Sequence, residues 1–211
     1  MQDLMPPAPM DPRSFAQRAN SGQAMVLDVR SYPAFSGLHI PGAWHIDLAG
    51  SFATQAGWII PPERDILLVV EGMPQVALAA LQLRRVGLDR VTAYLDGGML
   101  SWGANALPVG RVPVISPVRA HELLESGQAT LIDVRSVEEK TAEHAKGSID
   151  IAWHDLRTRY RELDPQGRYI LMCKGGQRAS IAASILKMKG FSSVCNLAGG
   201  FLAYQRSGYI P

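Results

Sequence analysis

The sequence has little cysteine, no long apolar run and little net charge. Its 211 residues include only two cysteines, Cys173 and Cys195, whereas a secreted disulfide framework usually has more of them in a shorter chain. No CxxC pair occurs, and no histidines and cysteines stand at the spacing of zinc ligands, so we expect no metal site. A cytoplasmic protein is the default expectation. In that reducing compartment each cysteine serves either packing or chemistry.

The lack of a long apolar run and of a large net charge limits the kinds of binding partner that we expect. No apolar run approaches the ~20 residues that a membrane helix needs, and a net charge of +2 is too small by itself to indicate nucleic acid. We therefore expect neither a membrane nor a nucleic acid as partner. Residues 1–13, MQDLMPPAPMDPR, have no basic segment followed by an apolar one, so we expect no signal peptide and interpret them as a loosely ordered, proline-rich leader. The hydrophobic share of 47% is typical of a globular chain with ample core material.

The chain repeats itself at about half its length. Residues 21–31, SGQAMVLDVRS, match residues 126–136, SGQATLIDVRS, at eight of eleven positions and an offset of 105. A unit of that length is a small domain and too long for a solenoid repeat. We predict two homologous domains, residues 10–108 and 114–211, joined within the Pro- and Gly-rich segment 107–117.

Each half has the same order of short apolar runs and helical patterns. The runs that indicate buried strands are residues 25–29, 66–70 and 91–95 in the first half and 130–134, 169–172 and 193–197 in the second. Helical patterns cover residues 75–86 and 178–189, and a glycine that can cap the helix follows each. Strands that alternate with helices predict an α/β fold, with a mostly parallel sheet flanked by helices in each half.

The segment LMCKGGQRAS, residues 171–180, predicts a reactive cysteine. Cys173 follows a predicted central strand and precedes a helix that begins near Arg178, at the sheet edge where α/β proteins bind ligands. The intervening loop can curl so that its backbone N–H groups point inward; its residues are Lys174, Gly175, Gly176 and Gln177. The helix N-terminus, Lys174 and Arg178 add positive charge. These surroundings favour a thiolate and an anionic substrate beside it, without a histidine base.

Both cysteines also admit a packing role, because free cysteine is among the most buried residue types. The charges that flank the glycines favour the reactive interpretation for Cys173. Cys195 lies in the apolar run SSVCNL on a predicted strand, so packing is favoured there. The alternative for Cys195 is a resolving thiol.

On these motifs the second half resembles a rhodanese domain, and the whole chain resembles a tandem-domain rhodanese of the thiosulfate sulfurtransferase type. The resemblance rests on LIDVR at residues 131–135, CKGGQRAS at 173–180 and KGFSSVCNLAGGFLAY at 189–204. It implies that Cys173 takes a sulfane sulfur from a small anionic donor such as thiosulfate, holds it as a persulfide and passes it to cyanide, a thiol or a protein thiol. It also implies that the donor is bound by Lys174, Gly175, Gly176, Gln177 and Arg178, and it implies no metal or organic cofactor.

The first half departs from this pattern at the loop that corresponds to the Cys173 loop. Alignment on the glycines that end the two helices sets Val70 opposite Cys173 and Glu71 opposite Lys174. A valine cannot carry sulfur and a glutamate repels an anionic donor, so we expect the first domain to be catalytically silent. By analogy with two-domain members, Tyr32 would face the active cleft, although an ordinary surface or core role is favoured.

Four further residues are interpreted as structural. We expect Asp133 and Arg135 to form an ion pair that supports the active loop rather than to act in catalysis. His39 and His144 stand at the repeat offset and are interpreted as turn residues.

Two alternatives to a sulfurtransferase stay open. A cysteine-dependent phosphatase of related fold needs five residues between its cysteine and arginine, whereas four separate Cys173 from Arg178. A non-enzymatic module that binds or senses sulfur compounds or anions is favoured by the silent first half and disfavoured by the intact second loop. Among donors, the charged loop fits thiosulfate better than mercaptopyruvate, because the loop of the mercaptopyruvate enzymes is usually small and neutral.

Overall fold

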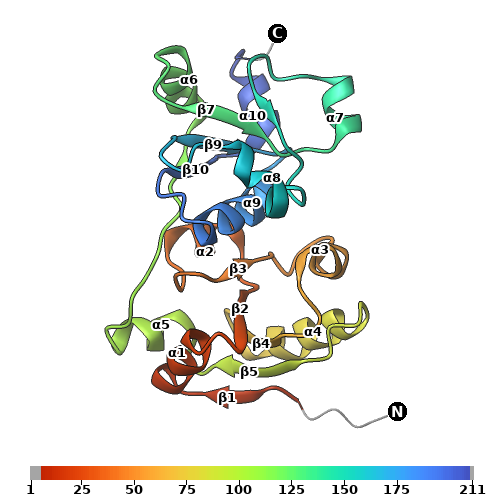
Figure 1. Ribbon diagram of the computed structural model, residues 1–211, viewed down its shortest axis with the longest axis vertical. Helices are drawn as coiled ribbons and strands as arrows, with labels where there is room; N and C mark the ends of the chain where they lie inside the picture. Colours follow the sequence, from red (N-terminus) through yellow and green to blue (C-terminus); the bar gives the residue numbers. More distant parts are fainter. Residues whose placement is uncertain (1–5, 210–211) are drawn as a thin grey trace. The chain divides into compact units, whose positions relative to one another are not determined.

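Two separate parallel sheets form, one in each half of the chain (Figure 1). The computed structural model describes residues 6–209, and the chain divides into two compact units between Gly110 and Arg111. Each unit holds a sheet of five strands, and all the strand pairings are parallel. The predicted α/β class, with a parallel sheet flanked by helices in each half, is therefore confirmed.

The first unit has the strand order β1-β5-β4-β2-β3. Its strands are β1 (Ala8–Met10), β2 (Ala24–Asp28), β3 (Trp44–His45), β4 (Asp65–Val69) and β5 (Val91–Leu95). Its helices are α1 (Pro12–Asn20), α2 (Tyr32–Gly37), α3 (Phe52–Ile59), α4 (Met73–Arg84) and α5 (Gly98–Ala104).

The second unit repeats this order as β6-β10-β9-β7-β8. Its strands are β6 (Val114–Ile115), β7 (Thr130–Asp133), β8 (Ile149–Asp150), β9 (Tyr169–Met172) and β10 (Val194–Leu197). Its helices are α6 (Pro117–Glu125), α7 (Val137–Ala142), α8 (Leu156–Arg159), the 3₁₀ turn η1 (Tyr160–Glu162), α9 (Gln177–Met188) and α10 (Gly200–Arg206). Its central strands bury almost every residue, as expected for a parallel sheet with helices on its faces.

The expectation of a loosely ordered leader is wrong for residues 8–13. Residues Ala8–Met10 form β1 and pair with β5, so backbone hydrogen bonds fix them to the sheet. Helix α1 begins directly afterwards, because the Asp11 carboxylate accepts hydrogen bonds from the first free N–H groups and Pro12 is preorganised for the first turn. Residues 1–5 lie outside the described residues.

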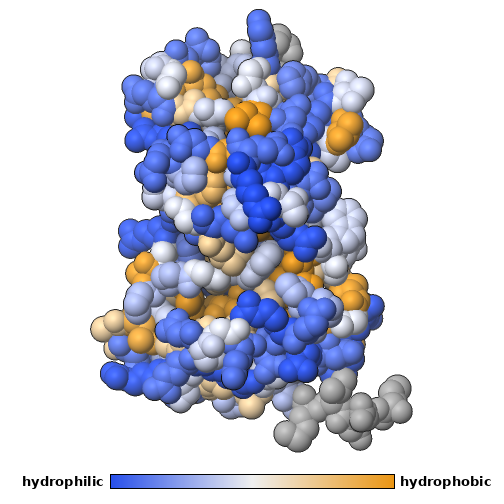
Figure 2. All heavy atoms as spheres, viewed as in Figure 1, coloured by the Kyte–Doolittle hydropathy of each residue, from blue (hydrophilic) through white to orange (hydrophobic). Residues whose placement is uncertain are grey.

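On the face drawn in Figure 2, hydrophilic residues predominate, and apolar residues stand in small patches separated by hydrophilic ones. Among the residues that the structure describes, no helix is both long enough and apolar enough to cross a lipid bilayer.

Candidate functional site

Cys173 lies where the sequence places it, between the end of β9 and the start of α9. Its side chain is buried, with 1% of its surface exposed, and its Sγ accepts a hydrogen bond of 3.1 Å from the N–H of Gly176. Gly176 has φ 112°, a backbone conformation that glycine adopts far more readily than other residues. This turn brings the loop back so that α9 begins directly beside the sulfur, with the positive end of its dipole toward it.

The N-terminus of α10 binds two carbonyl groups of the Cys173 loop. The N–H of Phe201 donates to the carbonyl of Cys173 at 2.7 Å, and the N–H of Leu202 donates to that of Lys174 at 3.3 Å. Because the N–H of a trans peptide points opposite to its carbonyl, the N–H groups of Lys174 and Gly175 are turned away from α10. The loop thus presents backbone donors on the side that an anion needs.

Gly200 makes this close approach possible. It adopts φ +58°, and a Cβ at this position would overlap the carbonyl oxygen of Cys173 and lie 2.8 Å from that of Lys174. Any larger residue would push the loop away from α10. Gly200 is therefore required by a backbone contact as well as by the turn.

Asn196 fixes a third carbonyl of the loop. Its Nδ2 donates to the carbonyl of Gly176 at 3.0 Å, and its side chain is fully buried on β10. Sequence reasoning missed this residue. The available signal is that one amide side chain stands in the otherwise apolar run SSVCNL, where a buried polar group requires a hydrogen-bond partner.

Arg178 is held by an acidic residue that the sequence analysis also missed. Its two terminal nitrogens donate to the two carboxylate oxygens of Glu139 on α7, at 2.5 and 2.8 Å. Glu139 is itself oriented by a capping box: its carboxylate accepts from the N–H of Ser136, whose hydroxyl accepts from the N–H of Glu139. The spacing Ser-x-x-Glu at residues 136–139 is the sequence signature of that box.

The charges of this pair are strongly coupled. The hydrogen bonds from Arg178 lower the pKa of Glu139 to about 2, against the opposing effect of partial burial. The pKa of Arg178 is raised, first by its bonds to Glu139, and the charge of a Cys173 thiolate and a hydrogen bond to it add to the rise. Arg178 therefore interacts both with the Glu139 carboxylate and with the Cys173 sulfur, and its positive charge stabilises negative charge on each of them.

The other loop side chains point to solvent. Lys174, Gly175 and Gln177 are exposed, and a Cβ added to Gly175 would meet nothing within 4 Å. Within the described part of the chain, no carboxylate forms an ion pair with Lys174. The space beside Gly175 is thus open, with one uncompensated cation next to it.

Asp133 and Arg135 form the ion pair that we expected, at the end of β7. Arg135 donates to both carboxylate oxygens of Asp133, at 2.7 to 3.0 Å, and both residues are buried. The guanidinium also donates to the carbonyl of Glu143 at 2.7 Å and lies 3.7 Å from the centre of the Phe201 ring. It thereby packs against the residue whose N–H holds the Cys173 carbonyl.

The same pair occurs in the first unit, which argues for a structural role. Arg30 donates to Asp28 at 2.6 Å and to the carbonyl of Leu38 at 2.6 Å. A pair that recurs where no nucleophile is present does not depend on the chemistry of Cys173.

The first unit has the corresponding loop without its reactive groups. Val70 is buried after β4, and the carboxylate of Glu71 accepts hydrogen bonds from the hydroxyl of Ser31 at 2.8 Å and from its N–H at 3.3 Å. A Cβ on Gly98 would lie 3.2 Å from the Val70 carbonyl, so this loop stands farther from α5 than the cysteine loop stands from α10. A pocket of about 480 Å³ lies there, and the residues that line it include no cysteine.

Cys195 is placed for packing. It stands opposite Ile170 in the sheet register, three residues before Cys173, which is roughly 10 Å along a strand. A disulfide requires Cα atoms within about 7 Å. Burial raises the pKa of the Cys195 thiol, so it is a weaker nucleophile than an ordinary cysteine at neutral pH.

The remaining sequence candidates make contacts within their own units. His39 is buried, its Nδ1 is 2.9 Å from the carbonyl of Phe35, and its ring stacks on the ring of that residue. His144 is exposed, 3.8 Å from Asp150, and Tyr32 is half-buried at the start of α2. Over residues 6–209, no group of three or more His, Cys, Asp or Glu side chains is placed to hold a metal ion.

Comparison with known proteins gives matches in both halves. The family described as Rhodanese-like domain matches residues 11–105 and again residues 116–207. The thiosulfate sulfurtransferase GlpE of Actinobacillus pleuropneumoniae is 32% identical over 94 residues, which are 44% of this chain and 87% of GlpE. The protein YrkF of Bacillus subtilis is 29% identical over 90 residues, 42% of this chain and 49% of YrkF, so the chain spans about half the length of that relative. A solved rhodanese-related protein from Thermoplasma volcanium is 25% identical with a TM-score of 0.43, over 46% of this chain and 94% of that one.

Proposed function

Because the chain belongs to the rhodanese family, with one rhodanese-like domain in each half, we propose that it is a sulfurtransferase whose sulfur carrier is Cys173. We assign the chemistry to residues 114–211 and a silent role to residues 10–108, in which Val70 replaces the cysteine. The observation that carries the proposal is the N–H of Gly176 at 3.1 Å from the Cys173 Sγ, in a loop where the N–H groups of Lys174 and Gly175 are turned away from α10. Relatives named as sulfurtransferases support sulfur transfer in general.

The proposed donor is thiosulfate or a similar anionic sulfane compound. The Cys173 thiolate attacks the outer sulfur of thiosulfate, the S–S bond breaks, and sulfite leaves with the bonding electrons. Cys173 then carries a persulfide anion, in the position where the Gly176 N–H and the α9 N-terminus stabilise negative charge. Cyanide, a small thiol or a protein thiol takes the terminal sulfur and regenerates the thiolate.

The loop charges favour an anion over a neutral donor. Arg178 is neutralised by Glu139, so Lys174 is the cation that the loop offers to a donor entering beside Gly175. One exposed lysine attracts a dianion more strongly than a monoanion. This favours thiosulfate over mercaptopyruvate in binding, while the attack itself depends on the backbone donors.

Steady-state transfer from thiosulfate to cyanide, followed as thiocyanate, tests the function. We expect turnover by the wild-type chain and none by Cys173→Ser. Lys174→Gln is expected to raise the KM for thiosulfate several-fold with little effect on kcat, and to raise the KM for mercaptopyruvate less. Lys174 precedes the first turn of α9, and Lys189→Gln, which removes a charge just past the last turn of α9, is the matched control. If the wild type transfers sulfur from neither donor to cyanide or to a thiol, the non-enzymatic module is the better account.

A further inference from the structure

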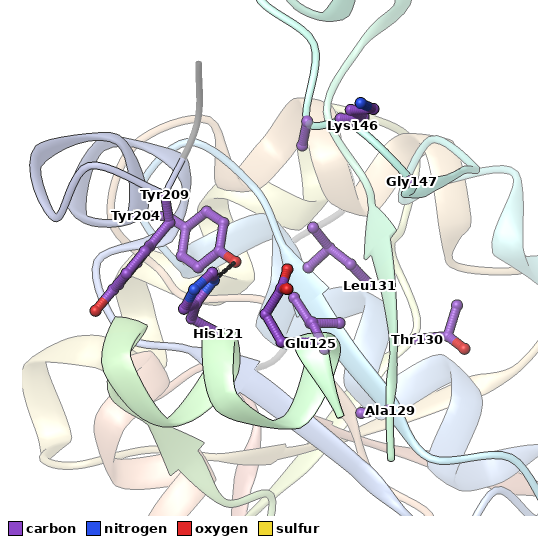
Figure 3. A pocket seen from close by; sticks show the side chains of 11 residues that line it. His121, Glu125, Ala129, Thr130, Leu131, Lys146, Gly147, Tyr204 and Tyr209 are labelled. Carbon is purple, nitrogen blue, oxygen red and sulfur yellow. Dashed lines mark hydrogen bonds between the residues drawn. The ribbon is translucent and has the colours of Figure 1, made fainter. Parts of the chain in front are cut away.

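The second unit has another pocket, at the edge of its sheet opposite Cys173. Figure 3 shows it between the C-terminal part of α6, the start of β7 and the C-terminal part of α10. Its volume is about 480 Å³, within the range of small-molecule sites. Cys173 follows the carboxyl end of β9, whereas Thr130 and Leu131, which line this pocket, begin β7. The pocket is therefore separate from the cysteine loop.

One wall of the pocket is negative. The carboxylate of Glu125 points into the hollow (Figure 3), and Glu125 is the last residue of α6. A helix C-terminus already carries partial negative charge, and a carboxylate there adds to it. The last turn of α6 contains no basic residue, so nothing within the helix end offsets this potential.

A buried hydroxyl stands beside that carboxylate. The Tyr204 ring is 5% exposed, and its OH lies 3.4 Å from Nδ1 of His121. The pKa of Tyr204 is raised by burial and further by the charge of Glu125, which places the two groups within electrostatic reach of each other. His121 is fixed in turn by stacking on Tyr209, with ring centroids 4.0 Å apart.

The opposite side of the pocket is positive, and the space between is partly apolar. Lys146 lines the pocket from the turn before β8, across the hollow from Glu125 (Figure 3). Leu124, Leu131 and Ala145 line the same space. The walls thus offer an acceptor for an ammonium group, a cation for a carboxylate and an apolar surface for a side chain.

The repeat shows that the first unit lacks these groups. At the offset of 105, Ala16, Asn20 and Pro41 stand in place of His121, Glu125 and Lys146. Phe15 and Trp102 fill the first core there, with rings 6.2 Å apart in an edge-on contact. In the second unit the position of Phe15 is taken by the much smaller Ala120. At this edge the second unit therefore has a small residue in place of Phe15, a tyrosine, Tyr204, in place of Trp102 when the two Gly-Gly pairs are aligned, and polar groups beside the hollow.

We propose that this pocket binds a small zwitterion of the α-amino-acid class with an apolar side chain. The ammonium group sits at Glu125 and the Tyr204 hydroxyl, the carboxylate at Lys146, and the side chain against Leu124 and Leu131. The site is independent of sulfur transfer, and its occupation does not block the cysteine loop.

Amide chemical shifts of the ¹⁵N-labelled full chain test the proposal, with L-leucine as the probe. We expect saturable shifts confined to residues 121–131, 145–147 and 203–209. L-leucine methyl ester at slightly acidic pH keeps the ammonium without the carboxylate, and 4-methylpentanoate keeps the carboxylate without the ammonium. Since a hydrogen-bonded charge is lost in Glu125→Gln, we expect this variant to bind both leucine and its ester at least about ten-fold more weakly.

Two further variants make the test specific. Lys146→Met is expected to weaken the binding of leucine but not that of its methyl ester. Glu122 lies one turn from Glu125 on α6 and outside the pocket lining, so Glu122→Gln is expected to change the affinity for neither compound. The proposal is overturned if leucine causes no saturable shifts at these residues, if 4-methylpentanoate binds as well as leucine, or if Glu125→Gln binds like the wild type. Glu125 is exposed, so its variant keeps the fold, which the unchanged remainder of the spectrum verifies.

Discussion

The carboxylate of Glu139 and the guanidinium of Arg178 form a two-bond ion pair that ties α7 to the first turn of α9. The pair sets the direction of the arginine that borders Cys173. It also removes Arg178 from the cations that are free to meet a donor. The loop is thus assembled from several parts of the chain: the segment before α9 provides the N–H groups, α10 and β10 hold the carbonyls, and α7 orients the arginine.

This pair predicts a particular pH dependence of stability. Folding lowers the pKa of Glu139 from its ordinary value of 4.5 to about 2, which corresponds to at most about 3 kcal/mol. With the side chain 29% exposed, solvent screening reduces this to about 1–2 kcal/mol. Because the pKa of Glu139 is lower in the folded state than in the unfolded state, the stabilisation is complete above about pH 4.5. It is lost as the pH falls toward 2.

Urea unfolding of Glu139→Gln measures this contribution. Glutamine keeps the capping box but loses the charge, so we expect a loss of about 1–2 kcal/mol at neutral pH that shrinks below pH 4.5. Glu122→Gln breaks the exposed pair with Arg119 and is expected to cost less than about 1 kcal/mol. A deficit in Glu139→Gln that is the same at neutral and at acid pH would show that the ion pair is not its cause.

The two Gly-Gly turns offer a matched pair of substitutions. Gly200 and Gly98 have nearly the same positive φ, +58° and +56°, so alanine costs each about 1–2 kcal/mol of backbone strain. At Gly200 the new Cβ also overlaps the Cys173 carbonyl, whereas at Gly98 it lies 3.2 Å from the Val70 carbonyl. We expect Gly200→Ala to lose most transfer activity and Gly98→Ala to retain it. Equal activities in the two variants would mean that the α10 contact does not shape the loop.

Asn196 is expected to matter for kcat more than for KM. Asn196→Ala removes one of two hydrogen bonds to the Gly176 carbonyl, which still accepts from the N–H of Ser180 at 3.0 Å. Losing one such bond costs about 0.5–1.5 kcal/mol of stability. It also loosens the peptide that follows the Cys173 hydrogen-bond donor. We expect kcat to fall at least ten-fold while the KM for thiosulfate changes little, because Lys174 is untouched. If Asn196→Ala is destabilised but its kcat and KM are unchanged, Asn196 contributes to the stability of the fold and not to the geometry of the Cys173 loop.

Cys195 is expected to be dispensable for transfer. Cys195→Ala removes a buried thiol, so it lowers stability by about 1 kcal/mol and leaves kcat within about two-fold. Non-reducing mass analysis after mild oxidation of the wild type is expected to show no bond between Cys195 and Cys173, given their separation in the sheet. A disulfide between them, or loss of turnover in the variant, would restore the resolving-thiol interpretation.

The sequence predicts the parts of this molecule that depend on local pattern. The repeat, the buried central strands and the glycine-rich loop after β9 all follow from periodicity and spacing. The short edge strands β1, β3, β6 and β8 do not, because two or three residues carry no periodic signal. Their positions are set by pairing with a neighbour that is distant in sequence.

Contacts across the fold explain what the sequence analysis missed at the site. Glu139 and Asn196 touch the cysteine loop from α7 and β10, and neither stands near Cys173 in the sequence. The Ser-x-x-Glu spacing predicts that a helix begins just after Ser136. It does not predict that the Glu139 carboxylate also binds Arg178. The requirement for Gly200 comes from a backbone approach that only the folded chain displays.

Peptide mass spectrometry of the reduced protein after incubation with thiosulfate is the most direct test of the proposed chemistry. The expected result is one added sulfur atom on the peptide that contains Cys173, removed again by cyanide or by a thiol, with no such gain on the Cys195 peptide. If Cys173 stays unmodified with thiosulfate, with mercaptopyruvate and with a persulfide donor, the loop does not carry sulfur, and the proposed mechanism is wrong.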